Sequence, residues 1–596
     1  MKLSIKYKKY LLLFIILFFF ILSLFLSNIN HAFSKDKLLI AAYIDGEYSS
    51  TLPSKGSGYT VDKIVCDNDE NAVWDYNKWG VKISNWSSKS KCNVYFKSLE
   101  SFTIANKTFY LDEVQRCPTM NDDGTVTFTD TELSFGYLCK AKDVYGDSYF
   151  YRGNVTNNYV KFGKWSDDTP DIVYSNFRSG GGGYFKEYSS LEECQNKSVP
   201  PGLVVPGTET ELKTNNCILD SRAGKDMYWR IVRFNGDGTV RVIYDGTKAH
   251  SNFEESTDRQ IGTSAFNLYW KKNNVRESTN SSIIHDNAAM GYMYGNRDGV
   301  VEESSQVSTL SFSNNSTYNI AKEYNYDAST DKFTLKNPIA VKGSAMTSDY
   351  VGYYTFSSNY TTSDDFIYKI TSVTAGSSSA RIGYSFVIYG TTSREKAQAY
   401  TNSSDIKTYL DTWYENNIKG TNYERYITDN IFCNDRSTEN TQNDGYGPEH
   451  IAYRWASIPW TFRHSNIRNK YMMLKCPRQV DAFTVDDTTN GNGALTYKVG
   501  LITTDEVVMA GGWSLGRSKY NYYLSTGQHY WTMSPMGGGT LRIVYYNGAA
   551  GRPDEPMGGY QQEDHAGHVN GVRPVLNLSS EVLKNGDGTA SNPFHP

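Results

Sequence analysis

The chain has 596 residues and a formal net charge of −4 at pH 7, with 60 Lys and Arg against 64 Asp and Glu. This nearly balanced, slightly acidic charge gives no electrostatic case for binding nucleic acid. The 47 tyrosines are typical of β-rich proteins, in which aromatic rings pack on half-buried strands. The length predicts several domains.

The first residues carry an export signal. Four lysines within residues 1–9 precede the apolar run YLLLFIILFFFILSLFLS at residues 10–27. Basic residues stay on the cytoplasmic side, so the rest of the chain is expected to be exported. The run is long enough for a retained anchor, whereas the small residues at 32–34 fit a cleavage site. Residues 1–35 are therefore predicted to be a signal peptide or a signal anchor, which leaves the body extracellular on the cell membrane or secreted.

Eight cysteines follow, all beyond the leader. An even number in an exported chain predicts disulfide bonds, and pairing of neighbours is the simplest connectivity, although some thiols could stay free and buried. The absence of a CxxC motif disfavours zinc ribbons and thioredoxin-like redox sites. The predicted pairs are Cys66–Cys92, Cys117–Cys139, Cys194–Cys217 and Cys433–Cys476.

The middle of the chain reads as successive β segments. Strand-like runs at regular spacing in residues 36–98 predict a small β-sandwich. Residues 99–226 predict a disulfide-stapled β region, in which MNDDGTVTF indicates a hairpin and residues 166–225 an insertion. The stretch YWRIVRFNGDGTVRVIY predicts a second hairpin, with its turn at residues 235–238. A further β-rich insertion is expected at about residues 299–382, where helical periodicity is lacking.

Two helices interrupt this β pattern. NSSDIKTYLDTWYENNIKG places its apolar side chains on one helix face, with Ser403 or Ser404 as the N-cap and Gly420 as the stop signal. LITTDEVVMAGG has Thr503 and Glu506 at the spacing of a capping box. The predicted fold class is therefore mainly β with a few helices (α+β).

The order of these elements carries a family resemblance. From residue 227 a hairpin, a helix, YITDNIFCND, a second helix, YWTMSP, LRIVYYNG and a closing GVRPVLNLS strand follow one another. This succession resembles bacterial surface modules of the C-type-lectin-like and formylglycine-generating-enzyme-like class, over residues 227–596. Residues 36–98 resemble the immunoglobulin-like modules of Gram-positive surface proteins. The resemblance implies two helices flanking a small antiparallel sheet, with irregular loops on one face and the closing strand near the first.

The activities of that class find little support in the residues. Formylglycine-generating chemistry needs redox-active cysteines near the domain's end, and none follows Cys476. RPDEP keeps Asp554 of a calcium-binding triplet but has arginine in its first position. QEDHAGH places His565 and His568 at a spacing that could hold a transition metal, with polar surface as the alternative. We therefore predict no catalytic residue and no cofactor, with Asp554, His565 and His568 as the remaining metal candidates.

Any ligand site is expected on the loops before the closing strand, because such scaffolds display function on loops. Aromatic rings there would supply flat surfaces with a polar edge, or would merely cover a thin core. The candidate ligand-binding residues are Trp513, Tyr520, Tyr522, Tyr560 and His565.

The leading interpretation is an exported cell-surface protein of the binding or adhesion type, non-enzymatic and of unknown ligand. Its expected partners are the membrane, through the N-terminal segment, and glycans or host or cell-surface proteins. Two alternatives stay open: an exported enzyme or metal-dependent glycan-processing protein, and a structural envelope protein.

Overall fold

The computed structural model describes most of the chain beyond the predicted leader. Residues 1–38 lie outside the described residues, so neither form of the leader prediction is tested. None of the described helices has the length and hydrophobicity that crossing a bilayer requires. The described residues are 39–54, 57–67, 71–75, 78–84, 91–111, 117–122, 126–127, 136–175, 178–179, 182–183, 186–197, 217–268, 287–303, 310–313, 315–330, 332–355, 366–376, 379–436, 471–512, 522–526, 528–537, 540–545, 560–565 and 569–596.

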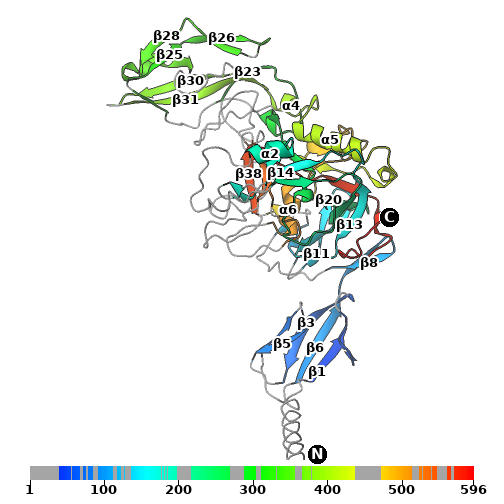
Figure 1. The fold of residues 1–596 in the computed structure, drawn as a ribbon. Coiled ribbons are helices and arrows are strands. Elements are labelled where there is room, and N and C mark those ends of the chain that lie inside the picture. The colour runs from blue at the N-terminus through cyan, green and yellow to red at the C-terminus, as the bar shows by residue number, and fades with distance from the viewer. Residues whose placement is uncertain are drawn as a thin grey trace, which may run out of the picture. The chain divides into compact units, whose positions relative to one another are not determined.

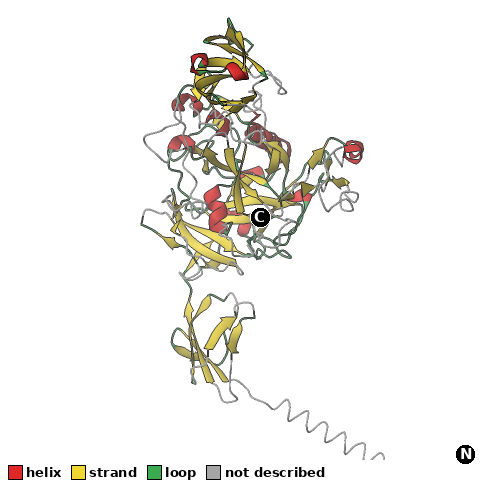
Figure 2. Ribbon diagram, turned by 90° about the vertical axis from the view of Figure 1, so that its left-hand side faces the viewer, coloured by secondary structure: helices red, strands yellow, loops and turns green. Residues whose placement is uncertain are grey.

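Strands dominate the described chain, and helices are few and short (Figure 2). This confirms the predicted mainly β fold of the α+β type. The chain divides into two compact units, and the division falls within the hairpin of β7 (Ser101–Ile104) and β8 (Lys107–Tyr110). The first unit holds residues 1–102 and 110–113, and the second holds residues 103–109 and 114–596.

The first unit is built from a four-stranded sheet and a hairpin. The sheet has the order β2-β1-β6-β3, in which β1 and β6 run parallel. Its inner face packs Val94 and Phe96 against Trp74 of the hairpin, whose ring meets the Phe96 ring edge-on at 5.3 Å between centroids. The strands are β1 (Leu39–Ile44), β2 (Glu47–Ser49), β3 (Tyr59–Cys66) and β6 (Lys91–Ser98), with β4 (Asn71–Asp75) and β5 (Gly80–Ser84) as the hairpin.

A six-stranded antiparallel sheet is central to the second unit (Figure 1). Its order is β11-β12-β19-β20-β40, and β13 pairs with the other half of β19. The predicted hairpin with its turn at residues 235–238 forms β19 and β20, and the closing strand pairs with β20. The sheet therefore joins segments that the sequence pattern separated at residue 226. Its strands are β11 (Gly136–Asp143), β12 (Gly146–Gly153), β13 (Tyr159–Lys164), β19 (Asp226–Phe234), β20 (Val240–Gly246) and β40 (Val575–Leu578).

A second sheet and the four α-helices found among the described residues complete this part of the unit. The sheet has the order β21-β39-β36-β37-β38. Ser404 caps α5 by accepting a hydrogen bond from the Lys407 amide, and Thr503 and Glu506 form the predicted capping box of α6. The strands are β21 (Gly262–Ala265), β36 (Tyr530–Gly537), β37 (Thr540–Tyr545), β38 (Tyr560–His565) and β39 (Val569–Val572); the helices are α2 (Leu191–Lys197), α4 (Arg394–Ala397), α5 (Asp405–Asn417) and α6 (Thr504–Ala510).

The predicted insertion after residue 299 is a β layer with its own core. Ile320, Ile370 and Ile382 pack at the centre of this core. The strands of this layer run from Gly299 to Gly390, and the insertion was expected at about residues 299–382. Its strands are β23 (Gly299–Glu303), β24 (Leu310–Ser313), β25 (Thr317–Ala321), β28 (Ile339–Lys342), β29 (Gly352–Thr355), β30 (Phe366–Thr374) and β31 (Ser379–Gly390), with the hairpin β26 (Glu323–Asp327) and β27 (Lys332–Lys336).

Small sheets hold the remaining described segments. The predicted hairpin in MNDDGTVTF is present as β9 paired with β10, and β34 joins its edge. The segment at 166–225 contains a three-stranded sheet of β14, β17 and β18. These strands are β9 (Thr119–Met120), β10 (Val126–Thr127), β14 (Ile172–Ser175), β15 (Arg178–Ser179), β16 (Gly182–Gly183), β17 (Lys186–Tyr188), β18 (Cys217–Asp220), β22 (Met293–Tyr294), β32 (Asn402–Ser403), β33 (Phe432–Cys433), β34 (Tyr471–Met472) and β35 (Ala482–Phe483).

All four predicted disulfides are present, and no cysteine is free. Each pair joins neighbours along the chain, with sequence separations of 22 to 43 residues. Four structural disulfides are typical of an extracellular or secreted protein, because the cytosol keeps thiols reduced.

The disulfide of the first unit should be a main source of its stability. Cys66 and Cys92 lie directly opposite each other on β3 and β6, and Cys92 is fully buried. We expect the double variant Cys66→Ser, Cys92→Ser to lose about 3 kcal/mol of unfolding free energy from this unit, since the open chain gains loop entropy on unfolding. Urea denaturation followed by tryptophan fluorescence would measure the loss. Val65→Ser, at the exposed neighbouring position, is the control, and equal effects of the two variants would contradict this role.

Candidate functional site

The predicted ligand residues before the closing strand are only partly described. Trp513 and Tyr520 lie outside the described residues. Tyr522 is described, and its side chain is 0% exposed. It is therefore a core residue and does not contribute a ring to an exposed recognition surface. Tyr560 and His565 stand at the two ends of the edge strand β38, opposite Tyr545 and Thr540.

The described residues do not show whether the three metal candidates lie close together. His568 and Asp554 lie outside them, and His565 has only its place on β38. Within the described part of the chain, no group of three or more His, Cys, Asp or Glu side chains could hold a metal ion.

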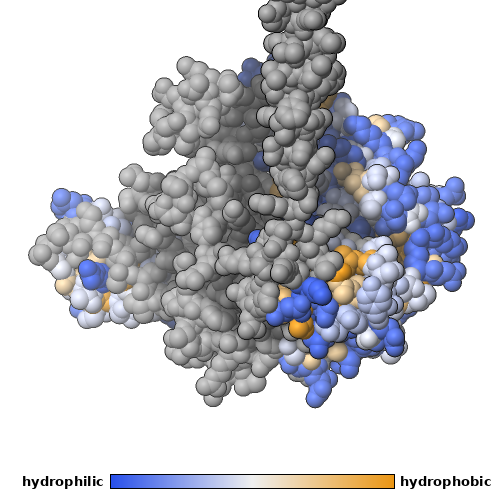
Figure 3. Space-filling model, turned by 90° about the horizontal axis from the view of Figure 1, so that it is seen from below, coloured by the Kyte–Doolittle hydropathy of each residue, from blue (hydrophilic) through white to orange (hydrophobic). Residues whose placement is uncertain are grey.

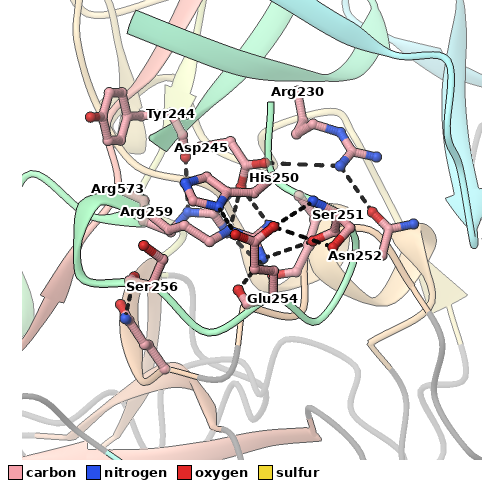
Figure 4. A network of polar contacts seen from close by, with 12 residues as sticks. Arg230, Tyr244, Asp245, His250, Ser251, Asn252, Glu254, Ser256, Arg259 and Arg573 are labelled. Carbon is pink, nitrogen blue, oxygen red and sulfur yellow. Dashed lines mark hydrogen bonds and ion pairs between the residues drawn. The ribbon is translucent and has the colours of Figure 1, made fainter. Parts of the chain in front are cut away.

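Buried arginines form the most conspicuous polar feature of the second unit. Asp245, at the end of β20, is fully buried and accepts hydrogen bonds from Arg259 and Arg573, each at 2.7 Å from the same carboxylate oxygen (Figure 4). Arg230 approaches the other oxygen of Asp245 to 3.9 Å and donates to Asn158 at 2.7 Å. The network joins β19, β20, the short helix Thr257–Arg259 before β21 and the turn between β39 and β40. Because these side chains are buried, the network stabilises the fold and is not accessible to a ligand.

A histidine lies between two carboxylates beside this network. His250 is fully buried, and its Nδ1 lies 3.0 Å from Glu254 (Figure 4). Its Nε2 lies 2.8 Å from Asp258. Gly246, with φ of +123°, lets the ring approach, because a Cβ there would lie 2.6 Å from the imidazole. Both ring nitrogens therefore face carboxylate oxygens. Burial raises the pKa of both carboxyls, but hydrogen bonds outweigh it: those from Lys248 and His250 lower the pKa of Glu254 to about 2, and those from His250, Ser256 and Thr247 hold the pKa of Asp258 below its ordinary value.

This cluster should give the second unit an acid-sensitive component of stability. Because the two carboxyl pKa values are depressed in the folded chain, the stabilisation is present above the unfolded values near about 4 and is lost as the pH falls toward about 2. Between about pH 5.5 and about pH 2.5, we expect the wild type to lose about 1–2 kcal/mol more than His250→Gln, since Glu254 is partly exposed. Urea denaturation across this pH range measures the difference. Lys142→Gln, at an exposed position outside the cluster, is the control and should follow the wild-type profile. A His250→Gln profile parallel to wild type would refute the coupling.

In contrast to the buried arginine network, an open groove in the second unit has side chains that a ligand can reach. This tyrosine groove has a volume of about 770 Å³ and is lined by residues of four segments: 161–164, 226–228, 422–426 and 590–596. Figure 1 shows the C-terminal end of the chain beside β13. The Phe594 carbonyl accepts a hydrogen bond from the Lys161 amide at 2.8 Å, and the Phe594 amide donates to Tyr159 at 2.9 Å. The groove thus lies where segments far apart in sequence meet the edge of the central sheet.

Local backbone features shape the groove. A bulge interrupts the pairing of β13 with β19 between Lys161 and Lys164, and Gly163 within it has φ of +86°. An L-residue with a side chain rarely adopts this conformation, which suits glycine. On the opposite wall, Gly420 ends the turn after α5, and the short helix Glu424–Tyr426 follows it. The Tyr426 carbonyl accepts a hydrogen bond from the Ser579 amide at 2.7 Å, which ties this wall to the segment after β40.

Aromatic rings line the groove. Phe162 is buried, and its ring meets the rings of Tyr423 and Tyr426 edge-on at 5.3 and 6.2 Å between centroids. Tyr228, opposite Lys161 in the sheet register, is half-buried like Tyr423 and Tyr426. Half-buried tyrosines are held in place by packing yet keep part of each ring and a hydroxyl accessible. The three tyrosines therefore offer a preformed surface to a ligand that has both a flat apolar face and polar groups.

The tyrosine groove was missed at the level of sequence. Tyr228 belongs to the predicted hairpin, and it stands opposite Lys161, where the β13 bulge begins. The segment NYERY, just after the glycine that stops α5, did carry a usable signal. It has two tyrosines and an arginine in a short connecting segment, where side chains are seldom needed for the core.

No known protein family, curated protein or solved structure matches this chain. The lectin-like and immunoglobulin-like resemblances therefore stay predictions, and the assignment of a ligand site depends on the geometry of the tyrosine groove itself.

Proposed function

We propose that this protein is an exported, non-enzymatic binding protein and that the tyrosine groove holds its ligand. One observation carries the proposal: three half-buried tyrosines, Tyr228, Tyr423 and Tyr426, line a single accessible groove. Sugar rings have an apolar face for stacking on aromatic rings and hydroxyls for hydrogen bonding, so a saccharide is the ligand class that best fits these side chains.

Polar neighbours support a hydrophilic ligand. Asn422, Ser591 and Asn592 also line the groove, and they supply donors and acceptors beside the rings. The face of the molecule in Figure 3 is mostly hydrophilic where it is described, with apolar residues in small groups. Such a surface favours recognition of a polar molecule over a large apolar docking interface.

The buried carboxylates argue for binding rather than catalysis. In the described part of the chain, Asp245, Asp481 and Glu506 are each held by at least one buried arginine, at 2.6 to 2.9 Å for the shortest contact. A general acid needs a proton to give and a place beside the substrate, and carboxylates buried against arginine offer neither. An exported enzyme that acts through residues 537–568 is the competing hypothesis, and much of that loop lies outside the described residues.

A glycan and protein array tests the proposal directly. We expect the purified full-length chain to bind one or more saccharides, and we expect Tyr228→Ala and Tyr423→Ala each to weaken that binding about 5- to 30-fold, as for a central aromatic contact. Tyr48→Ala is the matched control, because Tyr48 is 67% exposed in the first unit. The melting transition of each variant shows whether it is folded.

The same array separates the competing sites. If Trp513→Ala or Tyr560→Ala abolishes binding while the groove variants bind normally, the site lies on the loops before the closing strand. If only proteins bind, the saccharide class is wrong. Turnover of a bound glycan by the wild type would show an enzyme.

A further inference from the structure

The charges around the tyrosine groove are unequal. Three cationic side chains line it, those of Lys161, Lys164 and Arg425, against one acidic side chain, that of Asp226. The chain as a whole has a net charge of −4, so this excess of positive charge is a local feature and not a general property of the surface.

The one acidic side chain of the groove already has a partner. Asp226 lies 2.6 Å from the Lys161 ammonium, and this hydrogen bond raises the pKa of Lys161. The charges of Lys161 and Asp226 offset each other, and the cationic side chains that remain in the groove are Lys164 and Arg425. Both are exposed, and neither forms an ion pair with any other described residue. Glu581 lies close enough to Arg425 to feel its charge, but its ion pair is with Lys584 at 2.8 Å.

Arg425 is held in position for a ligand. It donates a hydrogen bond to the Tyr426 hydroxyl at 2.8 Å, and its guanidinium carbon lies 4.8 Å from the centre of the Tyr426 ring. These contacts use one donor and leave others of the guanidinium fork for an oxyanion. A planar cation fixed against a ring is poised for an acidic group whose own ring lies on the neighbouring tyrosines.

We infer that the tyrosine groove selects an acidic saccharide, with a sugar ring on Tyr228 and Tyr423 and its oxyanion on Lys164 and Arg425. This inference rests on the proposed function, since it names the chemistry of the ligand for the same groove. A carboxylate and a phosphate ester would both satisfy the two cations, and the shared requirement is a negatively charged oxygen group beside a sugar ring.

The inference is tested by binding of matched polymers to the full-length chain, measured by calorimetry at low and high salt. The probes are a neutral polysaccharide, a uronic acid polysaccharide, a sugar-phosphate polymer and polyglutamate. We expect one of the two acidic saccharides to bind about tenfold or more tightly than the neutral one, with affinity falling as salt rises. Which of the two binds identifies the anionic group.

Paired variants locate the preference. The double variant Lys164→Gln, Arg425→Gln should remove the preference for the acidic saccharide, while residual binding through the rings remains. The control is Lys142→Gln, Arg381→Gln, which makes the same change in net charge at two exposed positions outside the groove. Equal losses from the two double variants would overturn the inference, because they would indicate non-specific attraction.

Other outcomes separate this inference from the proposed function. If neutral and acidic saccharides bind equally and Tyr228→Ala weakens both, the groove is a saccharide site and the acidic preference is wrong. If polyglutamate binds as well as the acidic saccharides, the groove recognises negative charge alone and the saccharide class is wrong. If no polymer binds, both proposals fail.

Discussion

Replacing Asp245 with asparagine is expected to lower the free energy of unfolding of the second unit by about 3–5 kcal/mol. The carboxylate is fully buried, and it accepts hydrogen bonds from Arg259 and Arg573 and faces Arg230. An amide keeps the shape but removes the charge, so three buried guanidinium groups lose the carboxylate they share. Uncompensated buried charge is among the most destabilising changes in a folded protein.

Calorimetry of the full-length chain under oxidising conditions would measure this loss as a shift of the second unit's transition. Asp147→Asn is the matched control, because Asp147 on β12 pairs with Lys140 at 2.9 Å but is 43% exposed. Its effect should stay below about 1 kcal/mol, as for other surface ion pairs. A shift for Asp245→Asn no larger than that of the control would mean that the arginines find other acceptors and that the network does not hold the sheet together.

The features that the sequence predicted correctly are local ones. The hairpin turn at residues 235–238, the Ser404 cap and the Thr503–Glu506 capping box all depend on residues a few positions apart, whose geometry recurs in any protein. The neighbouring disulfides belong to the same class, since each closes a short loop.

The arginines of the central sheet could not be read in this way. In YWRIVRFNGDGTVRVIY, Arg230, Arg233 and Arg241 are isolated charged residues among apolar ones, and charged side chains of a strand are expected to face water. All three are buried, because other parts of the fold cover them and supply acceptors: Asn158 for Arg230, and Glu506 of α6 for Arg233 and Arg241. A pattern reports which residues share a face, but not what else the fold packs against it.

The tyrosine groove was beyond sequence analysis for a related reason. Its four segments span residues 161 to 596, and they meet through the pairing of β13 with β19, through the bridge between Val160 and Phe594 and through ring contacts of Phe162 with Tyr423 and Tyr426. Tyrosine is common on the surfaces of β-sheets, so no single tyrosine indicates a site by itself. The residues that were selected instead, such as Tyr522, stand in a Gly- and Tyr-rich stretch that looks loop-like, yet Tyr522 is buried.

Glu506→Gln is expected to destabilise the second unit as strongly as the change at Asp245, by about 3–5 kcal/mol. Glu506 is buried on α6 and lies 2.6 Å from Arg241 and 3.1 Å from Arg233, which stand on the two strands of the hairpin. Burial by itself raises the pKa of Glu506, but the two arginines outweigh it and hold the pKa below its ordinary value. With a depressed pKa, this stabilisation is present above the unfolded value and is lost as the pH falls.

The charge of Glu506 can be separated from its role as a helix cap. Its other oxygen accepts a hydrogen bond from the Thr503 amide at 2.9 Å, and glutamine keeps an acceptor for that bond while it removes the charge. Thr503→Ala removes only the threonine's half of the capping box and should cost about 1 kcal/mol. Urea denaturation of both variants at neutral pH compares the two contributions. If Glu506→Gln costs no more than Thr503→Ala, helix α6 is held by its cap and its apolar face, and the ion pairs with β19 and β20 add nothing. A larger cost for Glu506→Gln, shrinking as the pH is lowered, would show that the buried charge locks α6 onto the hairpin.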